Sequence, residues 1–305
     1  MFQIKRAGSG LEKNVRQNRE GEMEYLTFPS FEATGMVEHL FSTRLGGVSR
    51  GIYSSMNLSF TRGDNPKDVL VNYERIAAVL RCSVQDMVLS QQTHTVNIRL
   101  VTNKDRGKGI VRPLDYQDVD GLITCEKGIV LVTGYADCVP LYFLDPVHEA
   151  IGLAHSGWRG TASEMGRHMV EAMEQCFGSR PEELLAAIGP SICRDCYEVD
   201  GNAAESFRTM SEESPELLEE LTQSARFFDW QEKPLRVLTP GRRPGKYQLD
   251  LWLANLLILR KAGIPLDRIT VTDICTCHNP EYLFSHRATG GKRGNLGAFL
   301  LLKQN

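Results

Sequence analysis

The chain has 305 residues, 42% hydrophobic and 24% charged, with a formal net charge of −3 and a pI near 6.2. Such a length can bury a sizeable core, and we expect one domain. The scattered basic residues lack the footprint of a nucleic-acid-binding protein, and no apolar run approaches the roughly 20 residues that a membrane helix needs.

The first 24 residues are polar and carry basic residues without the apolar segment of a secretion signal. We expect residues 1–24 to form a ragged lead-in or an edge strand, and residues 25–305 to form the domain. The eight cysteines are spread along the chain, which favours free thiols, some of them metal ligands, in a cytoplasmic protein. Nothing in the sequence indicates an obligate protein partner.

A glycine-rich loop follows the strand predicted at 37–42, which is the second strand candidate of the domain after residues 25–28. Arg44 and Arg50 flank its two adjacent glycines, and Arg62 follows in TRGDN. Guanidinium forks in glycine-bearing backbone can bind phosphate or carboxylate. Each arginine could equally lie in an ordinary surface loop.

The next stretch predicts a helix and then two strands around a polar break. Asn65 suits the N-cap position and Pro66 the first turn of a helix that extends to about Leu80. Short strands at 87–89 and 97–101 flank SQQTHT, which contains His94. A histidine in such a break is ordinarily solvated, unless another part of the chain supplies a partner.

The densest chemistry lies between residues 133 and 161. Apolar strands are predicted at 141–144 and 150–154, joined at the turn-forming Asp145-Pro146. Cys138 lies just before the first strand and His155 just after the second, and these ends are adjacent in an antiparallel hairpin. The pattern therefore predicts a centre containing cysteine and histidine.

A helix is predicted directly after this centre. Thr161 is interpreted as its cap, and the apolar pattern continues to about Phe177, with Gly178 as the stop. The amino end of such a helix attracts anions, and Arg159 adds positive charge there.

Two further thiol motifs follow in the second half of the chain. Cys193 and Cys196 form a lone CxxC after a strand at 183–188, which suggests a structural or incidental role. Cys275, Cys277 and His278 follow a strand at 269–274 and could bind a metal, but their tight spacing hinders tetrahedral ligation by all three.

Strands outnumber helices and often adjoin in hairpins, so the predicted class is α+β rather than doubly wound α/β. Residues 201–225 are expected to form acidic helices, 249–262 an apolar helix and the carboxyl end a buried strand. No G-x-G-x-x-G after a strand and no P-loop is present, which argues against a nucleotide cofactor held by those devices.

Several distinctive segments occur along the chain in this order: FSTRLGGVSRGIYSSMNLSF, SQQTHT, DVDGLIT, ADCVPL, GLAHSGWRGT, IGPSI with CYEV, and FSHR with GKRG. Together they resemble the laccase-domain (YfiH/YlmD-like) family, once described as multicopper polyphenol oxidases and now regarded as purine nucleoside phosphorylases. The resemblance covers residues 28–303. It implies a single α+β domain of mixed and antiparallel sheets with flanking helices, the cytotoxic-necrotizing-factor/YfiH-like fold.

The resemblance implies a metal site built from His94, Cys138 and His155. Two imidazoles and one thiolate leave the fourth position of a tetrahedral zinc open, as in catalytic zinc sites. Copper is possible but disfavoured, because a multicopper oxidase needs additional histidine clusters and this chain has only seven histidines.

The resemblance also implies phosphorolysis of adenosine, inosine and S-methyl-5′-thioadenosine, with secondary adenosine deaminase activity. For phosphate and substrate we expect the residues Arg44, Arg62, Gln92, Arg159 and Arg287. Asp137 is a candidate for proton transfer, or else it orients a ligand or caps a turn. Trp158 could stack on the purine or pack in the core.

Two other functions stay open at this point. Cys138 could be a thiolate nucleophile with His155 as its base, acting on amides or peptidoglycan precursors. Alternatively, the thiols at Cys193, Cys196, Cys275 and Cys277 could make the protein a non-catalytic metal-binding or redox-sensing module.

Overall fold

The computed structural model describes residues 1–7, 14–212, 215–223 and 235–304. One six-stranded sheet has, in order across it, the strands Arg16–Glu20 (β1), Met23–Thr27 (β2), Val37–Ser42 (β3), Leu296–Leu302 (β15), Val130–Tyr135 (β7) and Met87–Leu89 (β4). The other has Ile269–Val271 (β14), Leu185–Ile188 (β10), Val139–Asp145 (β8), Ala150–Ser156 (β9), Gly121–Thr124 (β6) and Ile98–Leu100 (β5).

A small third sheet and several helices complete the described part of the chain. The small sheet consists of Glu198–Asp200 (β11), Lys246–Leu249 (β13) and Leu238–Pro240 (β12). The helices are Pro29–Glu32 (α1), Pro66–Val79 (α2), Trp158–Ala162 (α3), Met165–Phe177 (α4), Gly201–Glu205 (α5), Arg208–Glu212 (α6), Pro215–Gln223 (α7), Leu251–Lys261 (α8) and His286–Thr289 (α9).

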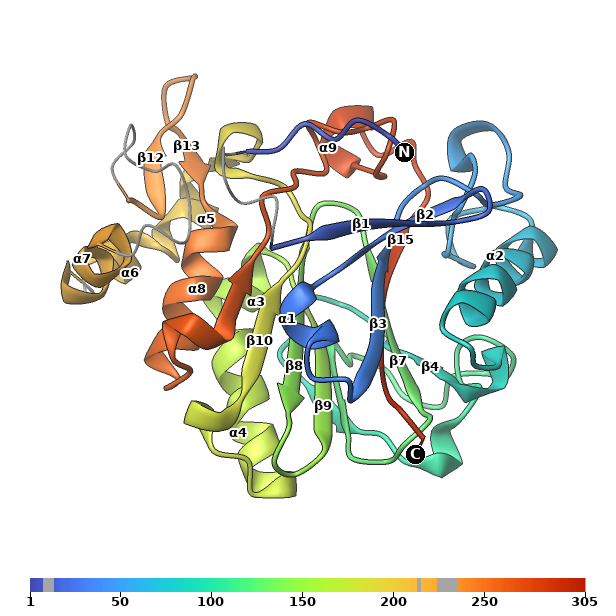
Figure 1. Cartoon of the computed structure of the whole chain (residues 1–305). Coiled ribbons are helices and arrows are strands. Elements are labelled where there is room, and N and C mark those ends of the chain that lie inside the picture. The colour runs from blue at the N-terminus through green and yellow to red at the C-terminus, as the bar shows by residue number, and fades with distance from the viewer. Residues whose placement is uncertain (8–13, 213–214, 224–234, 305) are drawn as a thin grey trace.

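The two large sheets pack against each other between layers of helix. In Figure 1, α3, α4 and α8 cover the outer face of the β10-β8-β9 sheet, and α2 covers the outer face of the β3-β15-β7 sheet. Most neighbouring strands are antiparallel, but β4 with β7, β5 with β6 and β10 with β14 are parallel. The predicted α+β class with mixed sheets and flanking helices is therefore confirmed.

Strands buried on both faces explain the continuous apolar runs in the sequence. In β8, Leu141 and Phe143 belong to the core beneath α4 and α8, whereas Tyr142 belongs to the core between the sheets. In β15, Leu300 faces the core between the sheets and Phe299 faces α2. The alternation follows from the two-residue period of a strand.

The local predictions for α2 and for the β8–β9 hairpin are confirmed. The Asn65 side chain accepts a hydrogen bond from the backbone N–H of Lys67, and Pro66 occupies the first turn of α2. In the hairpin, β8 and β9 pair antiparallel, and Pro140 lies directly opposite His155.

The single helix predicted from Thr161 is wrong. The segment forms two helices, α3 and α4, because Glu164 adopts a left-handed backbone conformation with φ of 55° between them. The Thr161 hydroxyl does not cap a helix; it contacts the Ser156 hydroxyl at 2.8 Å and accepts from the Asn255 side chain at 3.1 Å. Gly178 does end α4 in a left-handed conformation, as predicted.

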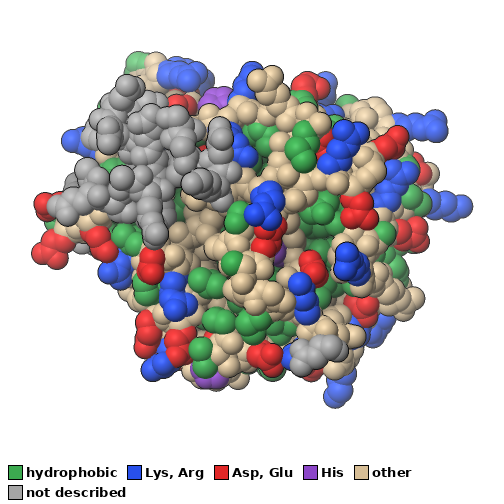
Figure 2. Space-filling model, in the orientation of Figure 1, with side chains coloured by type: hydrophobic (Ala, Val, Ile, Leu, Met, Phe, Trp, Pro, Cys, Tyr) green, Lys and Arg blue, Asp and Glu red, His purple; other side chains and the backbone are tan. Residues whose placement is uncertain are grey.

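The predicted lead-in contributes β1, an edge strand that pairs antiparallel with β2. The predicted boundary at residue 25 falls inside β2, and residues 8–13 lie outside the described part of the chain. The acidic region predicted as helical contains α5, α6 and α7, while residues 213–214 and 224–225 lie outside the described residues. On the face drawn in Figure 2, basic and acidic side chains are interspersed.

No helix within the described residues is both long enough and apolar enough to cross a membrane.

Candidate active site

Three side chains from two separate regions meet at one end of the β8–β9 hairpin. Cys138 directly precedes β8, His155 lies in β9, and His94 comes from the loop between β4 and β5. Their candidate ligand atoms all lie within 4.8 Å of one another. The structure thus brings together the three predicted residues, which we call the triad.

The backbone around His94 is held in an unusual conformation by one buried carboxylate. His94 has a φ of 69°, which a residue other than glycine rarely adopts. The fully buried Asp120 accepts hydrogen bonds from the backbone N–H groups of Thr93 at 3.0 Å, His94 at 3.1 Å and Thr95 at 3.0 Å. These contacts aim the His94 side chain at the site.

Asp120 also orients His155. Its Oδ1 lies 2.8 Å from His155 Nδ1, which leaves Nε2 of the ring available on the other side. A carboxylate on the second nitrogen of a ligating histidine is a common feature of metal sites, where it fixes the tautomer and ring orientation. The role of Asp120 was not predicted from the sequence, where its position in the DVDGLIT segment is the only signal.

Gly157, in the HSGWRG segment, leaves room for the triad. A Cβ atom at this position would lie 3.0 Å from Cys138 Sγ and 3.0 Å from His94 Cδ2. Contacts this short would displace one of the two side chains, so only glycine fits without moving the triad.

The charges within the triad shift the pKa values of its members. Burial alone would raise the pKa of Cys138, but the nearby His155 and His94 lower it to about 6. Burial would lower the pKa of His155, but the Cys138 charge and the hydrogen bond to Asp120 raise it to about 9. Burial also opposes ionisation of Asp120, yet the bonds from His155 and the backbone leave its pKa below the usual value.

The donor set fits a metal ion. A thiolate and two imidazoles are ligands of borderline-soft metals such as zinc. His155 is buried, Cys138 is half-buried and His94 is exposed, so the set opens toward solvent on one side. Two other groups of potential ligands occur among the described residues: Cys193, Cys196, Cys275 and His278, and Asp145, His148 and Glu183.

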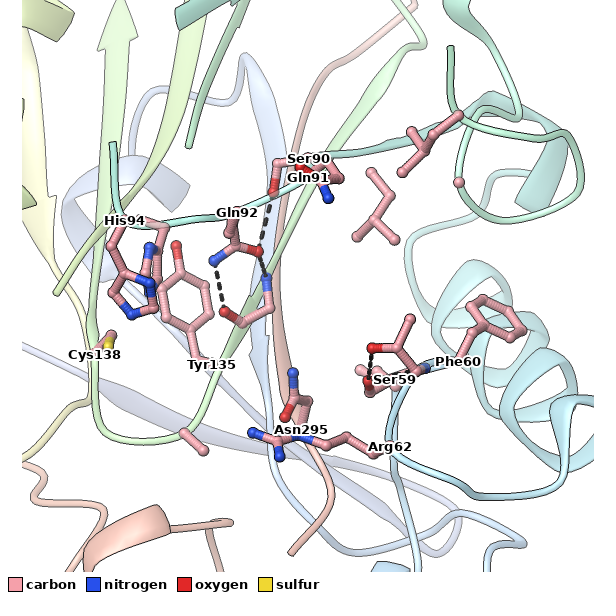
Figure 3. A pocket seen from close by; sticks show the side chains of 18 of the residues that line it. Ser59, Phe60, Arg62, Ser90, Gln91, Gln92, His94, Tyr135, Cys138 and Asn295 are labelled. Atoms are coloured by element: carbon pink, nitrogen blue, oxygen red, sulfur yellow. Dashed lines mark hydrogen bonds between the residues drawn. The ribbon is translucent and has the colours of Figure 1, made fainter. Parts of the chain in front are cut away.

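The triad lies in the wall of a cavity of about 520 Å³. Figure 3 shows His94 and Cys138 on one side of this cavity and Phe60 on the other, with Ser90 and Gln91 across from Arg62 and Asn295. The lining consists of Leu58, Ser59, Phe60, Thr61, Arg62, Leu89, Ser90, Gln91, Gln92, His94, Gly109, Leu114, Gly134, Tyr135, Ala136, Cys138, His155, Arg293 and Asn295.

Two guanidinium groups line the same cavity. Arg62 is exposed, whereas Arg293 is buried, and the Nε atom of Arg293 has no hydrogen-bond partner among the described residues. Burial and the charge of Arg62 lower the pKa of Arg293 to about 10. Two positive charges that line one cavity make it attractive to an anion. Arg293 stands in the GKRG segment, but nothing in the sequence alone distinguishes it as a binding residue.

Gln92 also lines the cavity and is locked onto β7. Its Nε2 donates to the Gly134 carbonyl at 2.8 Å, and its Oε1 accepts from the Gly134 N–H at 2.7 Å. The pair of bonds fastens the His94 loop to the large sheet, so Gln92 has a positioning contact as well as access to the cavity.

Asp137 does not line the cavity. Its Oδ1 accepts from the Thr276 hydroxyl at 2.6 Å and its Oδ2 from the Arg287 backbone N–H at 2.7 Å. These bonds join the residue beside Cys138 to the carboxyl-terminal part of the chain. A role of Asp137 in proton transfer stays a prediction.

The remaining predicted arginines also lie outside the lining of this cavity. Arg44 donates to the carbonyls of Ser54 and Pro280 and lies over the Phe284 ring. Arg159 stacks over Trp158, and Arg287 donates to the Cys196 carbonyl. Trp158 is half-buried and packs against the core beneath α4 and α8, away from the cavity lining. Their predicted contacts with substrate stay predictions.

Comparison with known proteins gives a consistent picture. A family model described as "Multi-copper polyphenol oxidoreductase laccase" matches residues 38–303. The chain is 36% identical over 265 residues to purine nucleoside phosphorylase YlmD of Bacillus subtilis (strain 168), covering 87% of this chain and 88% of that protein. It is 30% identical over 257 residues to adenosine deaminase RL5 from an unknown prokaryotic organism, covering 83% and 90%.

Solved structures agree. The crystal structure of YlmD from Geobacillus stearothermophilus has a TM-score of 0.80 to this structure at 34% identity, covering 94% of this chain and 99% of that one. The resemblance inferred from the sequence segments is therefore confirmed. The chain belongs to the YlmD/YfiH laccase-domain family.

Proposed function

We propose that this protein is a zinc-dependent purine nucleoside phosphorylase that acts on adenosine, inosine and S-methyl-5′-thioadenosine. The observation that carries the proposal is that the triad and two cavity-lining guanidiniums, Arg62 and Arg293, share one cavity. Relatives named purine nucleoside phosphorylase support it.

The cavity suits a nucleoside together with phosphate. Its volume of about 520 Å³ is within the range of small-molecule sites, which is roughly 300–1,000 Å³. Phe60 and Leu114 offer apolar surface for a purine, while Ser59, Gln91 and Asn295 offer hydrogen bonds for a sugar or base. Arg62 and Arg293 are the cations placed to bind phosphate, because guanidinium forks match its oxygens.

Zinc fits the triad better than a set of coppers does. A multicopper oxidase needs histidine clusters for oxygen chemistry besides its blue site. In the part of the chain that the structure describes, no candidate metal group contains more than two histidines. We therefore assign the site to a single zinc held by His94, Cys138 and His155.

The reaction divides the work among the chain's own residues. Arg62 and Arg293 would hold phosphate beside the sugar and offset its charge, so that it is aimed at the anomeric carbon while positive charge develops there. Asp120 keeps His155 in one tautomer. When bound, zinc would supply Lewis acidity toward a coordinated water or substrate atom. The predicted contributions of Arg44, Arg159, Arg287 and Asp137 to substrate binding and proton transfer belong to this proposal, although none of these residues lines the cavity.

Purified protein incubated with inosine and phosphate tests the proposal directly. We expect hypoxanthine and ribose 1-phosphate in equal amounts, with zinc found by mass spectrometry of the metal content. Zinc-loaded protein that releases no base from inosine, adenosine or methylthioadenosine would refute the proposed activity.

The arginine assignment has its own test. Arg62→Ala should raise the KM for phosphate about 10-fold, since one charge-assisted hydrogen bond contributes about 1.5 kcal/mol or more. Arg50→Ala is the matched control, because Arg50 is exposed on the neighbouring glycine-rich loop and does not line the cavity. Equal KM values for the two variants would remove Arg62 from the phosphate site.

Adenosine deamination is a second activity that we propose for the same cavity. It is favoured by the relative named adenosine deaminase and by the zinc-type triad, since deamination needs an activated water. Incubation with adenosine without phosphate should release ammonia and inosine. Absence of both products, in protein that phosphorolyses inosine, would limit the enzyme to phosphorolysis.

The cysteine-hydrolase alternative predicts a different metal content. A nucleophilic Cys138 needs a free thiolate and one base, whereas the triad supplies two imidazoles around the sulfur. Rapid alkylation of Cys138 by iodoacetamide in the protein as purified would favour the hydrolase. Protection that disappears when zinc is removed by a chelator favours the metal site.

A further inference from the structure

Two thiol motifs that are distant in the sequence meet on one edge of a large sheet. Cys193 and Cys196 follow β10, while Cys275 and His278 follow β14, and β10 pairs with β14 in parallel. A backbone bridge between Ser191 and Cys275 continues that pairing. The four candidate ligand atoms lie within 4.8 Å of one another. We call these four residues the thiol cluster.

The spacing of the ligand atoms in the thiol cluster suits a tetrahedral metal site. A Zn–S distance of about 2.3 Å places the ligand atoms of a tetrahedron roughly 3.8 Å apart. Cys193 Sγ lies 3.8 Å from His278 Nδ1, with no disulfide at any of the cysteines. The Cys193 backbone N–H donates to Cys275 Sγ at 3.3 Å, a bond that stabilises negative charge on sulfur.

The spacing problem that the sequence raised is resolved by the fold. Cys275, Cys277 and His278 are too close in sequence for all three to bind one ion, and only Cys275 and His278 belong to the cluster. The CxxC from the other segment supplies the remaining two ligands. Cys193 and Cys275 are buried, Cys196 is half-buried and His278 is exposed, so an ion has a route from solvent.

We propose that the thiol cluster binds one Zn²⁺ as a closed structural site, separate from the triad. Zn²⁺ takes the place of the protons on three thiols, which pass to solvent, while the neutral His278 imidazole binds through Nδ1. Protein residues fill all four positions, which distinguishes a structural site from a catalytic one. This site does not depend on the proposed enzymatic function.

The zinc would brace the segment next to the triad. The hydroxyl of Thr276, adjacent to the ligand Cys275, donates to Asp137, the neighbour of Cys138. The backbone N–H of Arg287 donates to the other oxygen of Asp137, and the Arg287 side chain donates to the carbonyl of the ligand Cys196. Both segments that carry the ligands therefore connect to Asp137.

The metal content of full-length variants purified in reducing buffer tests the site. His94→Ala/Cys138→Ala, which removes two triad ligands, should retain about one zinc per chain. Adding Cys193→Ser and Cys196→Ser should remove it. Cys125→Ser is the matched control for cysteine loss, because Cys125 is exposed and belongs to no candidate metal group among the described residues.

Two further measurements keep the proposal falsifiable if the multiple variant does not fold. In wild-type protein, chelator should expose Cys193, Cys196 and Cys275 to iodoacetamide together. His278→Ala should lose zinc more readily than Cys277→Ser. A folded triad variant without zinc, an intact mass showing a disulfide among these cysteines, or greater zinc loss from Cys277→Ser than from His278→Ala would each overturn the proposed Cys₃His site.

Discussion

The triad and the thiol cluster contain the same kinds of ligand but differ in number and surroundings. The triad offers three ligands beside a cavity of about 520 Å³, and a buried carboxylate holds one of its histidines. The thiol cluster offers four ligands from two strand ends and contributes no residue to that cavity. An incomplete ligand set beside a cavity suits chemistry on a bound molecule, and a complete set suits cross-linking of the fold.

The difference teaches that ligand type alone does not assign a role to a metal site. Histidine and cysteine occur in both places, and both sites lie at the ends of strands of the same sheet. What separates them is whether a coordination position is left open toward a space large enough for a substrate. The two sites should therefore respond in opposite ways to the same kind of mutation.

The largest effect is expected at the triad. Cys138→Ala should lower kcat/KM for inosine about 10³-fold, since a catalytic metal supplies several kcal/mol of transition-state stabilisation. When the metal-free proteins are compared, the melting temperature should change little, because Cys138 is only half-buried at an open site. Steady-state kinetics and a thermal melt measure both quantities. Comparable activity in Cys138→Ala and Cys125→Ala would contradict a catalytic triad.

The thiol cluster should show the reverse pattern. His278→Ala should lower the free energy of unfolding by about 3 kcal/mol, which is the contribution of a ligand present at 100 times its Kd or more. Activity of the folded fraction should fall far less than in Cys138→Ala. Denaturant titration with and without added zinc measures the change. If zinc stabilises wild type and His278→Ala equally, the cluster does not cross-link the fold.

The sequence predicted the parts of these sites that depend on local patterns. The β8–β9 hairpin follows from two apolar runs and the turn at Asp145-Pro146, and it brings Cys138 near His155. The helix cap at Asn65 can likewise be predicted from its sequence neighbours alone. His94, by contrast, was predicted as a member of the triad only from the resemblance to a family. No local sequence pattern shows which strand end its loop approaches.

Contacts between distant segments could not be predicted from one sequence. The CxxC at Cys193 looked isolated because its partners begin 79 positions after Cys196, at Cys275, beyond the end of a strand that pairs in parallel with β10. Asp120 looked like one acid among many, since its role depends on the backbone N–H groups of the His94 loop. Thr161 resembles a helix cap in the sequence, but in the fold its hydroxyl accepts a hydrogen bond from the distant Asn255.

In the triad a carboxylate, Asp120, orients the ligand His155, whereas in the thiol cluster a backbone N–H donates to the ligand Cys275. Replacing Asp120 tests how much zinc binding depends on that carboxylate. Asp120→Asn should weaken zinc binding at the triad up to about 100-fold, equivalent to 2.7 kcal/mol, because it removes the carboxylate that fixes His155. Competition with a zinc chelator measures the affinity. Asp118→Asn is the matched control, since Asp118 is exposed and its carboxylate accepts from the Thr93 hydroxyl, whereas the Asp120 carboxylate bonds His155. Equal affinities for the two variants would exclude an orienting role for Asp120.

The smallest expected effect is that of His39 on the pH dependence of the unfolding free energy. This effect has to be measured before zinc binding at the two sites is compared across pH. His39 is buried, its Nε2 accepts the Phe28 backbone N–H at 2.8 Å, and burial followed by the charge of Lys303 lowers its pKa to about 3. Between pH 6.5 and 3 the unfolded chain binds a proton at His39 that the folded chain does not, so stability falls as the pH decreases. His39→Gln keeps an acceptor for Phe28 and removes the titration, so its loss of unfolding free energy between pH 7 and 4.5 should be about 2 kcal/mol smaller than in wild type. Denaturant titrations at the two pH values give the difference. Equal losses of unfolding free energy in the two proteins would mean that acid destabilises the fold through groups other than His39.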